Sequence, residues 1–354
     1  MAHSNLAESG LATAGATRVL IIDDSVVARS VLGRMVEATR RFSVAAAFSD
    51  VSAALSWLER NRVDVILLDI EMPGIDGLTA LPDILLASHG AKVLVVSSSA
   101  DDGAATSVQA LALGAADTLV KPGIGAFGGR FAEVLEERLS KLFEAPLDLM
   151  PHMTGYGRVD APRDFDLVAI GASTGGIHAL SQFLRAIPAS FQVPILVTQH
   201  LPASFMGYFA AQLAVLGGRP CEVATDSMRI RPGRIVVAPG DAHMRVVRTS
   251  EGSAIRLTHE KSLSGCMPSV DPMFESVAEV FGKRALGVVL SGMGRDGCEG
   301  AGALFAAGAR VLVQDQASSV VWGMPGAVAN AGRASAVMRP DEIGRLVAGR
   351  GGRA

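Results

Sequence analysis

Short apolar runs alternate along this chain with segments whose apolar residues recur at helical spacing. In the first part of the chain, four of five such runs end in a charged or hydroxyl residue. Alternating strands and helices are typical of an α/β fold with a parallel, doubly wound sheet. The carboxyl ends of parallel strands share one edge of the sheet, where ligands bind. The predicted strands of this part are residues 18–24, 43–48, 63–69, 92–97 and 117–121.

The length of 354 residues suggests two domains. We predict a first α/β domain over residues 18–143 and a second, Rossmann-like doubly wound α/β domain over residues 166–348. Residues 144–165 contain several prolines and glycines without a clear period, which indicates a linker. Residues 1–17 are rich in Ala, Ser and Gly without a basic segment before an apolar core, so we expect a disordered lead-in and no signal peptide. Residues 221–258 have the pattern of short strands and turns, which predicts a β-hairpin insertion in the second domain.

The composition argues against several classes of partner. The net charge is −3 and aromatic residues make up 5% of the chain, so neither a basic field nor a base-stacking surface indicates nucleic-acid binding. No run reaches the length of a membrane span, so we expect no direct membrane insertion. The three cysteines, Cys221, Cys266 and Cys298, lack paired spacing, which fits packing roles in a reducing cytoplasm and not a disulfide or zinc framework.

Five polar residues fall at carboxyl ends of strands in the first predicted sheet. They are Asp23, Asp24, Asp69, Ser97 and Lys121. Three carboxylates meeting at one edge would repel one another unless a hard cation lay between them, and Mg²⁺ suits such an all-oxygen set. A metal-held carboxylate beside a lysine and a hydroxyl is a place to accept a phosphoryl group.

Residues 18 to about 142 resemble the receiver domain of a two-component response regulator, which has a flavodoxin-like sheet. Three features carry this resemblance: the Asp pair at 23–24, Asp69 followed by Met72-Pro-Gly, and Lys121-Pro122. It implies that Asp69 is the phosphoacceptor, that Asp23 and Asp24 bind Mg²⁺ with it, that Ser97 is the switch hydroxyl and that Lys121 senses the phosphate. Receivers often carry an aromatic switch residue three positions before the lysine, whereas this chain has Thr118, so we expect coupling mainly through Ser97.

The stretch Gly171-Ala-Ser-Thr-Gly175 follows an apolar strand and precedes a helical pattern. A Gly-x-Ser-x-Gly turn in this context can hold Ser173 at the edge of a sheet for attack on a carbonyl carbon. The helix N-terminus behind it offers free N–H groups to an oxyanion. A loop that cradles a phosphate or a dinucleotide is the alternative interpretation of the same stretch.

Two further strands in the second domain end in residues that fit a serine nucleophile. Residues 194–200 form a strand that ends in His200, and Asp296 lies in a strand-to-helix turn. A histidine beside the serine can act as its base, and a carboxylate can orient the imidazole. Asp241, in a predicted turn, is the other possible acid, but its position in a turn favours a surface cap. The order serine, histidine, acid differs from that of α/β hydrolases.

Residues 166–348 resemble the catalytic domain of the chemotaxis protein-glutamate methylesterases. The matching stretches are residues 171–176, 199–202, 238–240, 268–271, 292–297 and 322–325. The resemblance implies a serine hydrolase, without a cofactor in this domain, that converts glutamyl γ-methyl esters to glutamate and methanol and is a candidate for glutamine deamidation. Ser173, His200 and Asp296 would be the catalytic residues, and backbone N–H groups at Thr174 and Met293 are the oxyanion-hole candidates.

The same resemblance implies cytoplasmic partners: methylated helices of chemoreceptors as substrate, and a chemotaxis-type histidine kinase as phosphodonor. We expect the unphosphorylated receiver to lie across the Ser173 edge and to block the receptor. The sequence leaves open which receptor and kinase are involved, whether the pathway serves motility, and the oligomeric state. Two other functions stay as alternatives, a nucleotide-binding domain and a non-catalytic interaction module linked to a receiver.

Overall fold

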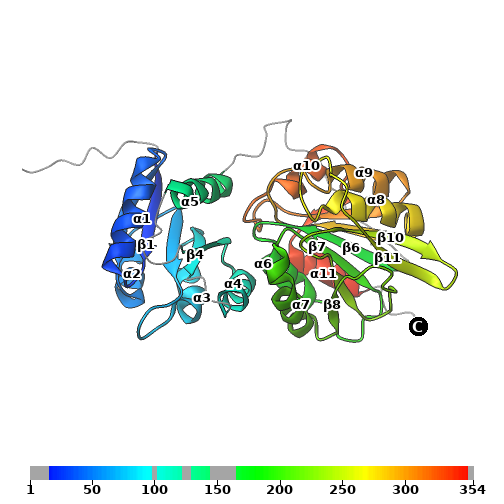
Figure 1. Cartoon of the computed structure of the whole chain (residues 1–354), viewed down its shortest axis with the longest axis horizontal. Coiled ribbons are helices and arrows are strands. Elements are labelled where there is room, and N and C mark those ends of the chain that lie inside the picture. The colour runs from blue at the N-terminus through cyan, green and yellow to red at the C-terminus, as the bar shows by residue number, and fades with distance from the viewer. Residues whose placement is uncertain (1–15, 98–101, 122–128, 144–164, 350–354) are drawn as a thin grey trace, which may run out of the picture.

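The computed structural model describes residues 16–97, 102–121, 129–143 and 165–349 (Figure 1). The lead-in expected over residues 1–17 and the linker expected over residues 144–165 lie outside these ranges, apart from residues 16, 17 and 165. Pro122, which follows the predicted phosphate-sensing lysine, is also outside them.

The first domain is a single parallel sheet covered on both faces. In chain order it comprises β1 (Thr17–Ile22), α1 (Val26–Ala38), β2 (Phe42–Phe48), α2 (Val51–Leu58), β3 (Val65–Asp69), α3 (Gly77–Ala87), β4 (Lys92–Ser97), α4 (Asp102–Leu113), β5 (Asp117–Val120) and α5 (Gly129–Leu142). The strand order is β2-β1-β3-β4-β5 and every neighbouring pair is parallel. Val19 and Ile21 pack with α1 and α5, whereas Leu20 and Ile22 pack with α2, α3 and α4. This division follows from the alternation of side chains along a strand.

The second domain is a larger sheet of the same class. It comprises β6 (Leu167–Ala172), α6 (Gly176–Arg185), β7 (Ile195–Gln199), α7 (Ala203–Gly217), β8 (Cys221–Val223), β9 (Ile235–Val237), β10 (His243–Thr249), β11 (Gly252–Thr258), α8 (Val270–Phe281), a 3₁₀ turn η1 (Gly282–Arg284), β12 (Ala285–Val289), α9 (Cys298–Ala306), β13 (Arg310–Gln314), α10 (Met324–Asn330), β14 (Ala336–Met338) and α11 (Pro340–Ala348). Seven parallel strands run in the order β14-β13-β12-β6-β7-β9-β8.

The strand order of this second sheet reverses at β6. The chain moves from β6 to β7 on one side and later returns to β12 on the other. Helices α6, α7 and α11 pack on one face, and α8, α9 and α10 on the opposite face. In doubly wound sheets the crevice for ligands lies at the carboxyl ends of the strands where the order reverses. The topology therefore places a site after β6, β7 and β12.

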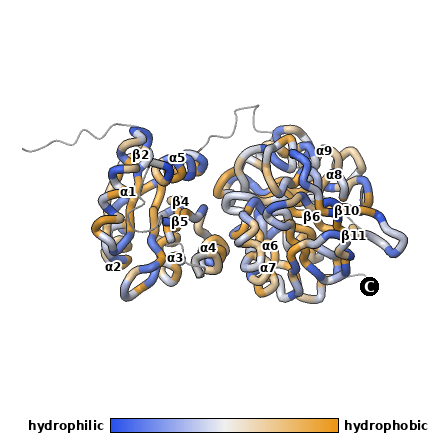
Figure 2. Tube along the Cα trace, viewed as in Figure 1, coloured by the Kyte–Doolittle hydropathy of each residue, from blue (hydrophilic) through white to orange (hydrophobic). Residues whose placement is uncertain are grey.

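The predicted α/β class, with two parallel doubly wound sheets, is confirmed. Strands β10 and β11 form the predicted antiparallel hairpin, whereas the short strands β8 and β9 extend the main sheet instead. Figure 2 shows that apolar residues concentrate along the central strands of both domains. Among the described helices, none combines the length and the apolar character that crossing a membrane requires.

The two domains share a hydrophobic cluster. Helix α4 of the first domain lies against α6 and α7 of the second (Figure 1). Buried residues of α4 such as Leu111 belong to the same cluster as Ile177 and Phe209. Ser181 on α6 donates a hydrogen bond to the backbone carbonyl of Ala112 at 3.4 Å. The face of the first domain that carries α4 and β5 is therefore turned toward the second domain.

Candidate active site

Ser173, His200 and Asp296 follow three neighbouring strands of the second sheet. Ser173 follows β6, His200 follows β7 and Asp296 lies in the turn between β12 and α9. Because β12, β6 and β7 are adjacent and parallel, their carboxyl ends lie at one edge. The three residues are far apart in the sequence, and the order of the strands brings them together.

The imidazole of His200 and the carboxylate of Asp296 form a direct pair. Nε2 of His200 lies 2.8 Å from Oδ2 of Asp296, whose side chain is only 1% exposed. Oδ1 of Asp296 accepts a hydrogen bond from the Ser269 hydroxyl at 2.6 Å, and Oδ2 accepts one from the Val270 N–H at 2.7 Å. The carboxylate is thereby held in one orientation. Asp241, the other possible acid, is exposed and forms no hydrogen bond or ion pair with His200 in the described part of the chain.

The environment of this pair favours its charged form. Burial alone would lower the pKa of the His200 imidazole, but hydrogen bonds and charges from Asp296 and Cys266 outweigh burial and raise it from 6.5 to about 9. Burial alone would raise the pKa of the Asp296 carboxyl, but hydrogen bonds from His200, Ser269 and Val270 hold it below its ordinary value. The surroundings of Asp296 therefore suit a charged carboxylate that orients the His200 imidazole and stabilises its protonated form.

Ser173 lies in a tight turn fixed by backbone contacts. Its N–H donates to the Ser291 carbonyl at 3.0 Å, and its carbonyl accepts from the Gln199 amide at 2.9 Å. Gly175 has φ of +75°, a left-handed conformation that disfavours side chains, and a Cβ there would lie 2.5 Å from Val320. Among the described residues, no hydrogen bond joins the Ser173 hydroxyl to His200. Because Nε2 faces Asp296, Nδ1 is the ring nitrogen left to accept a proton from serine.

Close packing beside Ser173 keeps a second loop near it. A Cβ at Gly292 would lie 2.9 Å from Cβ of Ser173 and 2.3 Å from the sulfur of Met324, so only glycine fits. The next residue, Met293, lines the same cavity as Thr174. Within the described ranges, the backbone N–H groups of Thr174 and Met293 donate no hydrogen bond. Both are free to bind an oxyanion beside Ser173.

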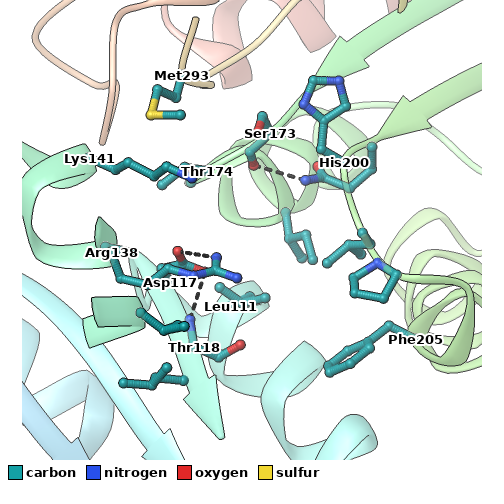
Figure 3. Close-up of a pocket in the computed structure, with 18 of the residues that line it drawn as sticks. Leu111, Asp117, Thr118, Arg138, Lys141, Ser173, Thr174, His200, Phe205 and Met293 are labelled. Carbon is teal, nitrogen blue, oxygen red and sulfur yellow. Dashed lines mark hydrogen bonds and ion pairs between the residues drawn. The ribbon is translucent and has the colours of Figure 1, made fainter. Parts of the chain in front are cut away.

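A cavity of about 850 Å³ lies between Ser173 and the first domain (Figure 3). The second domain contributes Ser173, Thr174, His200, Phe205, Cys266, Met267 and Met293 to its lining. The first domain contributes residues of α4, β5 and α5, including Leu111, Asp117, Thr118, Arg138 and Lys141. Asp117 and Arg138 form an ion pair at 2.7 Å in this wall. The predicted nucleophile thus faces a wall made by the other domain.

The polar residues predicted for the first domain also lie together. Asp23, Asp24 and Asp69 each place a carboxylate oxygen within 4.8 Å of the others. Nζ of Lys121 lies 2.9 Å from Asp23 and 2.7 Å from Asp69. The Ser97 hydroxyl is buried without a hydrogen-bond partner among the described residues. An all-oxygen set with an adjacent ammonium and a free hydroxyl fits Mg²⁺ and an incoming phosphoryl group.

Two buried residues without a role predicted from the sequence, His243 and Asp271, support the segment that holds Asp296. His243 is fully buried, accepts a hydrogen bond from the Ser269 N–H at 2.9 Å and lies 2.8 Å from the Glu260 carbonyl. Asp271 accepts from the Gly300 N–H at 2.8 Å, and burial together with the charge of Asp296 raises its pKa to about 7. The stretch Pro268-Ser-Val-Asp271 was the available signal, because a helix start of this kind presents free N–H groups to a carboxylate.

Comparisons with known proteins agree with this architecture. The family model for CheB methylesterase matches residues 168–347, and that for the response regulator receiver domain matches residues 19–125. A protein-glutamate methylesterase/protein-glutamine glutaminase 2 from Caulobacter vibrioides is 41% identical, with 94% of this chain and 98% of that protein covered. The protein-glutamate methylesterase/protein-glutamine glutaminase 1 from Paramagnetospirillum magneticum is 39% identical, with 92% of this chain and 94% of that protein covered.

A solved structure gives the same assignment for the second domain. The crystal structure of the Thermotoga maritima CheB methylesterase catalytic domain aligns with a TM-score of 0.50 and 31% identity, covering 52% of this chain and 98% of that chain. These matches argue against the two alternative functions, a nucleotide-binding domain and a non-catalytic interaction module. The chain therefore belongs to the CheB methylesterase family, with a response regulator receiver domain ahead of its catalytic domain.

Proposed function

We propose that this chain is a phosphorylation-regulated serine hydrolase that converts glutamyl γ-methyl esters on chemoreceptors to glutamate and methanol. The observation that carries the proposal is the 2.8 Å contact between His200 and Asp296 at the sheet edge where Ser173 also lies. The family membership supports the reaction class. The test is release of methanol from receptor-containing membranes methylated beforehand, with and without a phosphodonor.

The reaction follows from the positions of the three side chains. Ser173 and His200 line the same cavity, and Nδ1 of His200 would take the proton of the serine hydroxyl as Oγ attacks the ester carbonyl carbon. Asp296 keeps the proton of Nε2 in place and stabilises the imidazolium. The N–H groups of Thr174 and Met293 bind the oxyanion. His200 then protonates the departing methoxide to give methanol. In the second half of the reaction His200 takes a proton from water, the resulting hydroxide attacks the acyl carbon, and the proton returns to Oγ of Ser173 as glutamate leaves.

The lining of the cavity suits a methyl ester. Phe205, Met267 and Met293 contribute apolar side chains to the cavity that Ser173 lines, and burying a methyl group against such side chains is favourable. Deamidation of glutamine would use the same nucleophile and base, with ammonia in place of methanol as the leaving group. We propose it as a second reaction of the same site.

The receiver supplies the regulation of this hydrolase. Asp69 is the proposed acceptor of a phosphoryl group from a histidine kinase, and Mg²⁺ held by Asp23, Asp24 and Asp69 would neutralise the charge of that group during transfer. Lys121 immediately follows β5, and β5 forms part of the cavity wall opposite Ser173. A phosphoryl group on Asp69 would draw Lys121 from its present pairing with Asp23 and Asp69, which links phosphorylation to the position of β5.

The receiver lies opposite Ser173, and this position explains how the unphosphorylated receiver would block a large substrate. Ser173 opens into a cavity of about 850 Å³ whose far wall is the receiver. A receptor helix is about 10–12 Å across with its side chains, and its glutamyl esters must reach Ser173 from outside. We propose that phosphorylation weakens the contact of α4 with α6 and α7 and so exposes the site.

We expect residues 160–354 alone to hydrolyse receptor esters faster than the unphosphorylated full chain, by about 5–150-fold, the usual range for coupling between two sites. Phosphodonor with Mg²⁺ should bring the full chain toward the same rate. The measurement is methanol release from methylated receptor membranes. If the isolated catalytic domain is no faster, the receiver does not act by covering Ser173.

A pair of substitutions tests the same contact in the full chain. Leu111, 7% exposed, is buried where α4 faces the catalytic domain, whereas Leu86 on α3 is 82% exposed. Leu111→Asp should raise the rate of the unphosphorylated chain, because an unpaired charge is costly at a buried contact. Leu86→Asp is the matched control and should leave the rate unchanged. Phosphorylation of Asp69 in both variants verifies that each receiver is folded.

We expect the hydrolysis rate to rise with pH until about pH 9. The neutral imidazole of His200 is the form that accepts a proton, and its pKa is raised to about 9, so below that pH most of the enzyme carries the inactive imidazolium. The measurement is kcat/KM for a small ester as a function of pH in the full chain. An ascending limb at or below the ordinary histidine pKa of 6.5 would contradict the environment described for His200.

A further inference from the structure

Cys266 lies against the catalytic pair, in the segment between β11 and α8. One ligating atom from each of Cys266, His200 and Asp296 lies within 4.8 Å of the other two. Cys266 is half-buried and lines the cavity beside Ser173. The hydrolytic steps described above need a serine, an imidazole and a carboxylate, and they give the thiol no task.

We propose that this active site binds Zn²⁺ through Cys266, His200 and Asp296, and that the bound ion switches hydrolysis off. Thiolate, imidazole and carboxylate are the three ligand types that zinc takes in proteins, at about 2.3, 2.0 and 2.0–2.2 Å. The atoms need only small movements to reach such distances, since the half-buried Cys266 lies in a segment without helix or strand. His200 and Cys266 both line the cavity, so water can reach the ion as a fourth ligand.

The electrostatics of the three ligands suit a dication. On binding, the Cys266 thiol releases its proton to solvent, so a thiolate and the Asp296 carboxylate together balance the charge of Zn²⁺. The hydrogen bonds from Ser269 and Val270 already hold the carboxylate, as outer contacts do at metal sites. Sulfur and nitrogen ligands disfavour Mg²⁺, which belongs with the carboxylates of Asp23, Asp24 and Asp69.

Zinc would stop the reaction whichever ring nitrogen it occupies. An ion on Nδ1 removes the lone pair that accepts the proton of Ser173. An ion on Nε2 displaces the contact with Asp296 and leaves the ring proton on Nδ1, where it again faces the serine. This inhibitory half of the inference rests on the proposed function, whereas the metal site itself does not.

The first test is cobalt spectroscopy, which needs no catalytic activity. Full-length protein in excess Mg²⁺ is titrated with Co²⁺, and we expect a thiolate-to-cobalt absorption band that Zn²⁺ displaces. Cys266→Ala should lose the band, while Cys221→Ala, the matched control in the edge strand β8, should keep it. Ser173→Ala, which removes none of the three ligands, should also keep it. A wild-type protein without the band, or a band that survives Cys266→Ala, overturns the site.

The second test is inhibition in the activated full chain with phosphodonor and Mg²⁺. We expect Zn²⁺ to abolish methanol release and a zinc-selective chelator to restore it. Inhibition of each variant is measured relative to its own metal-free rate. The zinc concentration for half inhibition should rise at least about tenfold in Cys266→Ala and stay unchanged in Cys221→Ala. Cobalt binding through Cys266 without zinc inhibition would overturn the switch. A metal-free enzyme without activity would instead refute the proposed function, and the cobalt spectrum would still test the site.

Discussion

Replacing Ser173 with alanine should lower the rate of methyl-ester hydrolysis on the order of 10⁴-fold or more, the scale of losses when a catalytic triad loses its nucleophile. The hydroxyl is the group that attacks the ester, and its backbone is fixed independently by Ser291 and Gln199. The turn should therefore survive the substitution. The measurement is methanol release by the activated chain, with thermal melting to verify folding.

Two further variants make this result specific. Ser190→Ala places the same substitution at an exposed position before β7, at the opposite end of the sheet, and should leave the rate unchanged. Adding His200→Ala to Ser173→Ala should cost little more than either change alone, because the residues of a triad act as a unit. Half of the wild-type activity in Ser173→Ala would refute its role as nucleophile.

Replacing Asp296 with asparagine should lower the rate on the order of 10⁴-fold, the scale known for an amide in place of a triad carboxylate. An amide N–H directed at Nε2 of His200 moves the ring proton to Nδ1, which can then no longer accept the proton of Ser173. The loss of the charge should also lower the pKa of His200, so the residual activity should reach its plateau at lower pH. The measurement is a pH–rate profile of wild type and variant.

Asp241→Asn is the matched control for this substitution. Asp241 is exposed, so the change should leave both the rate and its pH dependence as in wild type.

Asp296→Asn should also destabilise the fold by about 1–3 kcal/mol, since Ser269 and Val270 lose part of a buried acceptor. A crippling effect of Asp241→Asn together with a harmless Asp296→Asn would show that the acid is misassigned.

Much of the fold could be predicted because its signal is local. Apolar runs such as residues 167–170 have the length and composition of buried strands, and each is followed by a helical period. The position of Ser173, His200 and Asp296 at strand ends followed from the same pattern. The placement of β8 and β9 in the main sheet did not, because three-residue strands carry too little periodicity to show what they pair with.

The sequence by itself determined the two α/β domains and the residues at the carboxyl ends of their strands, since both depend on the spacing of neighbouring residues. Only the tertiary structure decided which of these strand ends meet. The strand order β12-β6-β7 joins Asp296, Ser173 and His200. Asp241 follows β9, the other neighbour of β7, but its side chain is exposed and His200 pairs with Asp296 instead. The packing of the folded chain also brought Cys266 beside His200 and set helix α4 against helix α6. These contacts link residues far apart in the chain, and their partners are chosen by how the sheets and helices pack, which no local pattern encodes.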